Sequence, residues 1–159
     1  MIKRHIEPKL KQWAEQYPVI TVTGPRQSGK TTLVRAVFGG KAYVSLENPD
    51  VRAYAMEDPR GFLGDYRQGA ILDEVQRVPE LLSYLQEMVD TDREAGRFIL
   101  TGSQHFLMMR DVSQSLAGRT AILTLLPLSL EEVPNPSELE NLDGVIQRGF
   151  YPRLHEQRF

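Results

Sequence analysis

The sequence predicts a three-layer α/β domain with a five-stranded parallel sheet, preceded by an N-terminal helix. Two observations carry this prediction: five apolar segments alternate with helical segments, and several of the apolar segments end in polar residues. Such alternation favours right-handed crossovers, which place helices on both faces of a parallel sheet. Ligands of these sheets bind at the carboxyl ends of the strands.

The expected elements follow one another along 159 residues. An amphipathic helix is expected over 3–16, because Ile6, Leu10 and Trp13 recur at helical spacing. Strands are expected at 19–23, 41–46, 69–74, 97–103 and 120–125. Helices are expected at 32–38, 49–56, near 60–66, from 79 onward, at 106–111 and around 137–147. We expect one domain over 1–159, with about 134–159 as a C-terminal extension.

The first strand runs into a glycine-rich turn that opens a helix. This turn matches G-x-x-x-x-G-K-[ST], the phosphate-binding P-loop. Backbone N–H groups of such a loop and the positive end of the helix dipole bind phosphate oxygens. We expect Lys30 at the β- and γ-phosphates and the Thr31 hydroxyl among the Mg²⁺ ligands. The candidate nucleotide-binding residues are Gly24, Pro25, Arg26, Gln27, Ser28, Gly29, Lys30, Thr31 and Thr32.

Two carboxylates end the third strand. Asp73 and Glu74 follow four residues suited to burial, as in a Walker B segment. We expect Asp73 to hold Mg²⁺ through a coordinated water and Glu74 to orient and polarise an attacking water. The other interpretation is that the pair only caps the following helix. Gln76 either contacts the γ-phosphate or water, or is a plain surface residue.

Polar residues also flank the fourth and fifth strands. Ser103 closes the fourth strand, where its hydroxyl can contact the γ-phosphate or the attacking water, unless it only forms local turn hydrogen bonds. Arg119 precedes the fifth strand. Its guanidinium can neutralise transition-state charge in its own subunit or across an oligomer interface, or it can simply be solvated. Residues 2–6 can lie beside the P-loop and approach the base, or serve as ordinary core.

Composition limits the classes of function. The net charge of −2 argues against a broad basic surface, so nucleic acid is not expected as a partner. No apolar run reaches the roughly 20 residues of a membrane helix, and the N-terminus has no signal-peptide pattern. The absence of cysteine excludes disulfides and thiolate metal sites, and the three histidines show no ligand spacing. We therefore expect a cytoplasmic protein without a transition metal.

Several motifs occur in an order that resembles a known family. Besides the P-loop they are Leu72-Asp73-Glu74-Val75-Gln76-Arg77-Val78-Pro79-Glu80-Leu81-Leu82, Phe98-Ile99-Leu100-Thr101-Gly102-Ser103, Leu116-Ala117-Gly118-Arg119 and Pro127-Leu128-Ser129-Leu130-Glu131-Glu132. Together they resemble a family of bacterial and archaeal AAA-type ATP-binding proteins, P-loop ATPases whose C-terminal half is a domain of unknown function.

The resemblance implies a sheet order of 5-1-4-3-2, ATP with Mg²⁺ as ligand, and the roles given above for Lys30, Thr31, Asp73 and Glu74. It places the family's polar residue after the fourth strand at Ser103 and its Gly-Arg pair at Arg119. Members of the family usually continue well past residue 159, and residues 150–152 resemble the start of that next region.

The resulting prediction is a domain that binds ATP with Mg²⁺ and hydrolyses it to ADP and phosphate. The alternative is a nucleotide-dependent switch or interaction module with little turnover, acting through a homo-oligomer or an unknown protein partner. A nucleic-acid-associated motor and a small-molecule kinase are further alternatives. DNA binding at low salt would indicate the motor, and transfer of phosphate to an added acceptor rather than to water would indicate the kinase.

Overall fold

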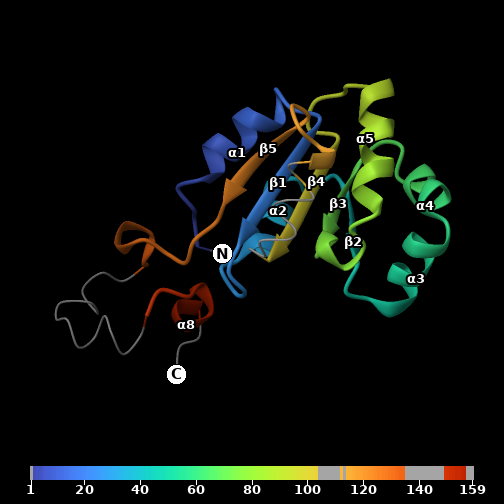
Figure 1. The fold of residues 1–159 in the computed structure, drawn as a ribbon. Helices are drawn as coiled ribbons and strands as arrows, with labels where there is room; N and C mark the ends of the chain where they lie inside the picture. The colour runs from blue at the N-terminus through green and yellow to red at the C-terminus, as the bar shows by residue number, and fades with distance from the viewer. Residues whose placement is uncertain (1, 104–111, 113, 135–148, 157–159) are drawn as a thin grey trace.

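The computed structural model describes residues 2–103, 112, 114–134 and 149–156 of the chain. Five parallel strands form one sheet in the order β2-β3-β4-β1-β5 (Figure 1). Read from the other edge, this is 5-1-4-3-2, so both the parallel sheet and its order are confirmed. The strands are β1 (Val19–Gly24), β2 (Ala42–Ser45), β3 (Ala70–Asp73), β4 (Phe98–Ser103) and β5 (Thr120–Thr124).

Helices cover both faces of the sheet. Side chains of α1 and α2 pack into one apolar cluster, and side chains of α3, α4 and α5 pack into the other. The helices are α1 (Glu7–Ala14), α2 (Lys30–Val37), α3 (Pro49–Glu57), α4 (Pro59–Asp65), α5 (Leu81–Thr91) and α8 (Pro152–Glu156), with 3₁₀ turns η1 (Val75–Arg77) and η2 (Leu130–Glu132). The helices expected at 106–111 and 137–147 lie outside the described residues.

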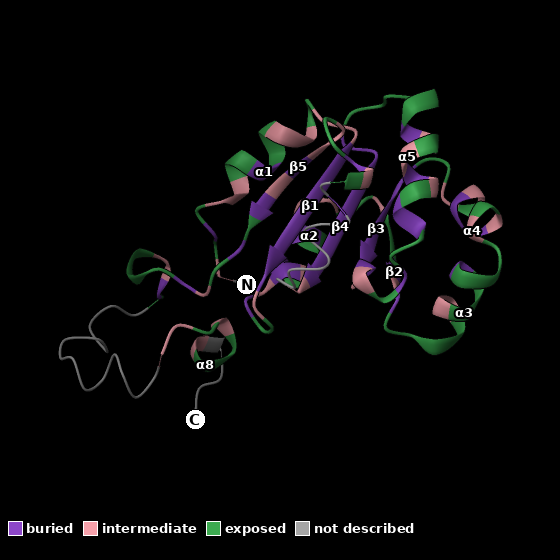
Figure 2. Cartoon of the chain, viewed as in Figure 1, coloured by how far each residue is buried: buried purple, intermediate pink, exposed green. Residues whose placement is uncertain are grey.

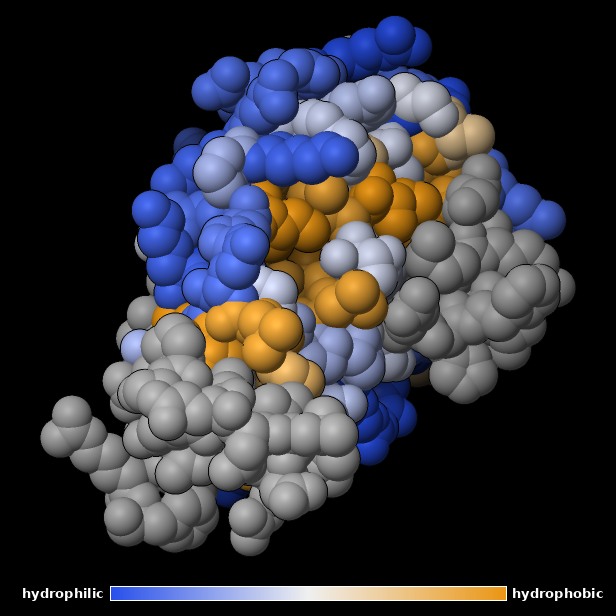
Figure 3. All heavy atoms as spheres, turned by 90° about the vertical axis from the view of Figure 1, so that its left-hand side faces the viewer, coloured by the Kyte–Doolittle hydropathy of each residue, from blue (hydrophilic) through white to orange (hydrophobic). Residues whose placement is uncertain are grey.

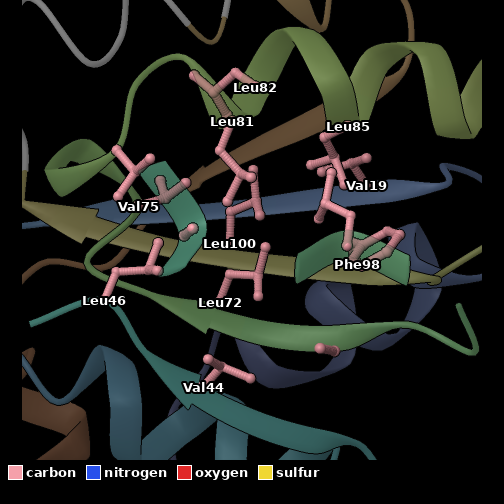
Figure 4. Close-up of a cluster of buried hydrophobic side chains, with 14 of the residues drawn as sticks. Val19, Val44, Leu46, Leu72, Val75, Leu81, Leu82, Leu85, Phe98 and Leu100 are labelled. Atoms are coloured by element: carbon pink, nitrogen blue, oxygen red, sulfur yellow. The ribbon is translucent and has the colours of Figure 1, made fainter. Parts of the chain in front are cut away.

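The two clusters follow from the alternation of side chains along a strand. Val19 and Leu72 belong to the same apolar cluster as Leu85 of α5, and Figure 4 shows Val19 beside Leu85. Ile20 follows Val19 in β1, and Ile71 precedes Leu72 in β3. Both therefore face the other side of the sheet, where the cluster contains side chains of α1 and α2. Both faces of the central strands are covered, so these strands are buried along almost their whole length, whereas the helices alternate buried and exposed positions (Figure 2).

Local sequence sets where the helices begin. Each of α3 and α4 starts with a proline, which suits the first helical position. The Asn48 side chain accepts a hydrogen bond from Asp50 N at 2.9 Å, and Asp58 accepts one from Gly61 N at 2.9 Å. These caps satisfy backbone donors that the first turn leaves free.

The first helix is shorter than expected. It begins at Glu7 rather than at residue 3, with a proline in its first turn. The residues before Glu7 are not part of this helix, and the Arg4 side chain among them binds the P-loop. In the part of the chain that the structure covers, no helix has the length and apolar character needed to cross a membrane.

Candidate functional site

The P-loop joins β1 to α2 at the carboxyl edge of the sheet (Figure 1). Its turn requires unusual backbone angles, with φ of +149° at Gly24, +64° at Gln27 and +91° at Gly29. A Cβ atom at Gly24 would lie 2.1 Å from the carbonyl oxygen of Leu125, so only glycine fits there. The turn brings the amino end of α2, with its positive dipole, to the edge where ligands of such sheets bind.

The Lys30 ammonium lies at the P-loop itself. The residue is 6% exposed, and its Nζ donates hydrogen bonds to the carbonyl oxygens of Gly24 at 3.1 Å and Pro25 at 2.8 Å. Burial lowers the pKa of Lys30, while the carboxylates of Glu74 and Asp73 act in the opposite direction. A cation held in this way is placed to contact an anion on the loop.

Three hydroxyl groups surround the Asp73 carboxylate, which is 6% exposed. Thr31 Oγ1 lies 3.1 Å from both carboxylate oxygens, Tyr43 donates to Oδ2 at 2.7 Å, and Thr101 donates to Oδ1. Burial and the bond to Asp73 raise the pKa of Tyr43 to about 12, so its hydroxyl remains a donor at neutral pH. The structure thus brings together the two residues expected to hold a metal, Thr31 and Asp73.

This donor set fits Mg²⁺. Carboxylate and hydroxyl oxygens are the ligands that Mg²⁺ prefers, and it binds through one or two carboxylates together with substrate phosphates. Within the described ranges, no group of three or more His, Cys, Asp or Glu side chains could hold a metal alone. A site of this kind therefore depends on oxygens that a phosphorylated ligand supplies.

Glu74 and Ser103 are linked through Gln76. Gln76 Nε2 donates to Oε2 of Glu74 and to Oγ of Ser103, the latter at 3.2 Å. Ser103 pairs in register with Gly24, which places it beside the start of the P-loop. Glu74 itself adopts a left-handed backbone with φ +60°, a conformation that costs energy for a non-glycine residue and clusters at functional sites. Gln76 faces these groups rather than serving as a plain surface residue.

Arg119 lies at the opposite edge of the sheet. Its carbonyl oxygen accepts a hydrogen bond from Val19 N at the start of β1, whereas the P-loop follows the end of β1. Its guanidinium binds Asp90 at 2.5 and 2.8 Å, which raises the pKa of Arg119 and lowers that of Asp90. The structure therefore does not bring Arg119 to the P-loop of its own chain: the six residues of β1, at about 3.3 Å each, separate the two.

A hollow of about 500 Å³ lies over the P-loop. Arg26, Gln27 and Thr32 are exposed along it, while Ser28 is fully buried beneath the loop. Helix α8 borders the hollow, because Pro152 Cγ lies 3.6 Å from the position of a Cβ on Gly29. The hollow is lined by Arg26, Gln27, Gly29, Lys30, Thr31, Thr32, Glu47, Glu74, Pro152 and Arg153.

Sequence reasoning missed Arg4, a 6% exposed arginine behind the P-loop. Its guanidinium donates to Ser28 O at 2.8 Å, to Leu126 O at 2.7 Å and to Pro127 O at 3.2 Å. Its Nε lies 3.2 Å from Oε2 of Glu132. This single side chain therefore connects the N-terminal segment, the P-loop and the segment after β5.

Glu132 is held from three directions. It accepts hydrogen bonds from His5 N at 2.6 Å and Ser129 N at 3.0 Å, in addition to its ion pair with Arg4. Burial alone would raise the pKa of Glu132, but these partners lower it. The signal that could have found this residue is the Ser129-x-x-Glu132 spacing of a capping box, which the structure contains.

A second hollow, of about 580 Å³, lies next to Arg4. Figure 3 shows hydrophobic atoms gathered on this side of the molecule, bordered by hydrophilic ones. Leu126 and Tyr151 are 61% and 38% exposed there. The lining residues are Arg4, His5, Ile6, Thr124, Leu125, Leu126, Pro127, Leu128, Ser129, Glu132, Phe150 and Tyr151.

A P-loop at the carboxyl edge of a parallel 5-1-4-3-2 sheet, faced by a buried aspartate two strands away, defines the class of P-loop ATPase domains. Comparison with known proteins gives the family. The AAA domain family matches residues 16–134, and the chain belongs to it.

The chain is also similar to two curated proteins. Two uncharacterized proteins, from Mycobacterium bovis and Mycobacterium tuberculosis, are each 36% identical over 133 residues, which cover 82% of this chain. The chain spans 30% of the length of these curated relatives.

Two solved structures share the fold at low identity. The Walker-type ATPase of Pyrococcus abyssi has a TM-score of 0.64 at 18% identity, covering 96% of this chain and 65% of that one. DnaA from Aquifex aeolicus, bound to AMPPCP, has a TM-score of 0.60 at 18% identity, covering 95% and 56%. At these identities the similarity concerns the fold.

Proposed function

We propose that this domain binds ATP with Mg²⁺ and hydrolyses it to ADP and phosphate. The observation that carries the proposal is the 3.1 Å contact between Thr31 of the P-loop helix and Asp73 of β3. This contact places the P-loop hydroxyl and the carboxylate close enough together to bind the same Mg²⁺ ion. Lys30 lies on the same loop, and Glu74 follows Asp73 directly.

Each residue then has a defined task. Thr31 and Asp73 would hold Mg²⁺, which neutralises charge on the β- and γ-phosphates when bound. Lys30 binds the γ-phosphate, and Glu74 orients water and accepts its proton as the water oxygen bonds to phosphorus. The bond from the γ-phosphorus to the bridging oxygen breaks, and ADP leaves with that electron pair. Ser103, through Gln76, fixes the Glu74 carboxylate.

The second hollow suits the nucleobase. Its volume of about 580 Å³ and its apolar lining are typical of small-ligand pockets. Its wall includes Leu125, whose carbonyl oxygen lies against Gly24 at the start of the P-loop. Residues 4–6 contribute to the same wall, in line with the expectation that this segment approaches the base. The apolar hollow therefore favours a nucleotide over a bare polyphosphate.

One observation favours the alternative of a nucleotide switch with little intrinsic turnover. Glu74 is engaged by Gln76, and Arg119 is bound to Asp90 at the far end of β1, so Arg119 does not reach the site of its own chain. We therefore propose that Arg119 acts in the site of a neighbouring subunit, with a homo-oligomer as the partner. Nucleic acid is not proposed as a partner, and the cysteine-free chain is consistent with the cytoplasm, where ATP is supplied.

Phosphate release from Mg·ATP, measured over a series of protein concentrations with ATP binding in parallel, tests the proposal. Glu74→Gln is expected to lose turnover by about 100-fold or more while retaining ATP binding, because a neutral amide cannot accept the proton. Lys30→Ala is expected to weaken binding of Mg·ATP itself. If Lys30→Ala binds Mg·ATP as the wild type does, the assignment of the P-loop is wrong.

The concentration series separates the two candidate functions. A specific rate that rises with protein concentration, and that Arg119→Ala abolishes, indicates a site completed by a neighbour. ATP binding without turnover at any concentration indicates a switch.

A further inference from the structure

Tyr43 lies beside the metal-binding pair, although the motifs do not include it. It belongs to β2, the edge strand, and pairs in register with Ile71 of β3. Ile71 and Asp73 are two residues apart in β3, so their side chains leave the same face of the sheet. Tyr43 shares that face, and its long side chain reaches forward along the strand to the Asp73 carboxylate.

Two contacts hold the Tyr43 side chain in this direction. Its hydroxyl donates to Asp73 Oδ2 at 2.7 Å, and the guanidinium of Arg35 lies 4.7 Å from the centre of its ring. Arg35 is four residues after Thr31 in α2, so both face the same side of that helix. The helix that supplies the P-loop threonine therefore also supplies the residue that stacks on Tyr43.

The hydrogen bond restricts the rotation of the carboxylate. Thr101 binds Oδ1 from β4, and Tyr43 binds Oδ2 from β2, so Asp73 is held between its two neighbouring strands. Thr101 is fully buried, whereas Tyr43 is 37% exposed at the open edge of the sheet. Groups that hydrogen-bond a metal ligand fix its orientation, and their removal usually weakens metal binding.

We propose that Tyr43 is a positioning residue for the divalent cation: its hydroxyl holds Asp73 in the orientation that receives Mg²⁺. This inference rests on the proposed function, because it presupposes that Thr31 and Asp73 form the metal site. Tyr43 does not touch the nucleotide in this proposal. Its loss weakens metal binding and leaves binding of the metal-free nucleotide unchanged.

Electron paramagnetic resonance of Mn²⁺, titrated into the protein with the non-hydrolysable analogue AMPPNP, tests this without relying on turnover. Tyr43→Phe keeps the ring and its contact with Arg35 but removes the hydroxyl. We expect it to weaken Mn²⁺ binding in the ternary complex by about tenfold. Binding of AMPPNP in EDTA is expected to equal that of the wild type, which also reports that the variant is folded.

Tyr54→Phe is the matched control. Tyr54 also donates from its hydroxyl to an aspartate, Asp65 Oδ2 at 3.0 Å, but on the exposed surface of α3 and α4. It is expected to leave Mn²⁺ affinity unchanged. A second variant, Arg35→Met, keeps the Tyr43 hydroxyl but removes the stacked cation, and is expected to weaken Mn²⁺ binding by about threefold.

The outcomes are distinct. If Tyr43→Phe binds Mn²⁺ as tightly as the wild type or more tightly, Tyr43 does not position Asp73 and the inference is overturned, while the proposed function stands. If the wild type binds AMPPNP but Mn²⁺ has no affinity for the complex, the metal site itself is wrong and both proposals fail. A loss of about tenfold in Tyr43→Phe, with Tyr54→Phe unchanged, supports both.

Discussion

Replacing Arg4 by methionine should cost this domain a large part of its stability. Methionine keeps a long apolar stem, but it leaves the Glu132 carboxylate without its ion-pair partner and the Ser28 and Leu126 carbonyl oxygens without their guanidinium donor. Both side chains of the Arg4–Glu132 pair are 6% exposed, and removing one partner of a buried pair costs about 3–5 kcal/mol. The whole domain is expected to be stable by about 5–15 kcal/mol, so the change is severe.

Urea denaturation measures this loss, and the chain contains a matched control. Arg60 binds Glu87 in two-pronged fashion at 3.1 and 2.8 Å, but these side chains are 68% and 59% exposed. Arg60→Met is therefore expected to cost far less than Arg4→Met, because exposed ion pairs contribute little to stability. Should Arg4→Met fall within about 1 kcal/mol of that control, the buried pair does not stabilise the fold as argued.

The double variant Arg4→Met/Glu132→Gln isolates the pair. Once Arg4 is absent, an uncharged amide at position 132 relieves the buried charge. The combined loss is therefore expected to be smaller than the sum of the single losses by at least about 1 kcal/mol. Arg4→Met should also weaken ATP binding, because the Ser28 carbonyl oxygen that it releases belongs to the P-loop.

Two further predictions concern stability. Gly24→Ala is expected to lower the free energy of unfolding, measured with urea, by about 2–4 kcal/mol, because φ at Gly24 is +149° and a Cβ would lie 2.1 Å from Leu125 O. Gly40→Ala is the control and should change stability little, because no atom lies within 4 Å of a Cβ there. An equal loss in both variants would contradict the steric argument. Because the pKa of Glu132 is lowered in the folded state, its carboxylate contributes its full stabilisation of the fold at pH values above the usual glutamate pKa of about 4.3. This stabilisation is lost as the pH falls below that value. In melting scans from about pH 7 to 3.5 the advantage of the wild type over Glu132→Gln should shrink, and a constant difference would count against this linkage.

Local patterns in the sequence predicted the sheet and its site edge. The β-branched run before Gly24 and the apolar run before Asp73 are strands in the structure, and Thr31, which follows the first strand in the P-loop motif, meets Asp73 at the end of the second. These elements are encoded within a few neighbouring residues, so periodicity and spacing suffice to predict them. The strand order could not be predicted from these local patterns. It was predicted from the resemblance to a known family, which rests on several motifs that occur in the same order along the chain.

Residues whose role depends on tertiary contacts could not be found in this way. Arg4 contacts Leu126 across 122 positions, and nothing beside it in the sequence indicates burial of an arginine. Tyr43 lies in a short strand whose alternating pattern gives it no special role. Its contact with Asp73 depends on the register of β2 with β3, which the local sequence does not show. The alternatives for Arg119 stayed open in the sequence, because its position before β5 does not say whether its side chain reaches the P-loop end of the sheet.

The long reach of Arg4 also bears on the order in which the chain folds. Its contacts join residues 24 and 122 positions apart, and such closures form slowly because the intervening chain must first be ordered. The sheet can assemble before them, but the support behind Ser28 is complete only when the segment after β5 has docked. ATP binding should therefore be acquired in the last phase of refolding, after the helical signal has recovered, and a nascent chain should gain affinity only once residues past 132 have left the ribosome.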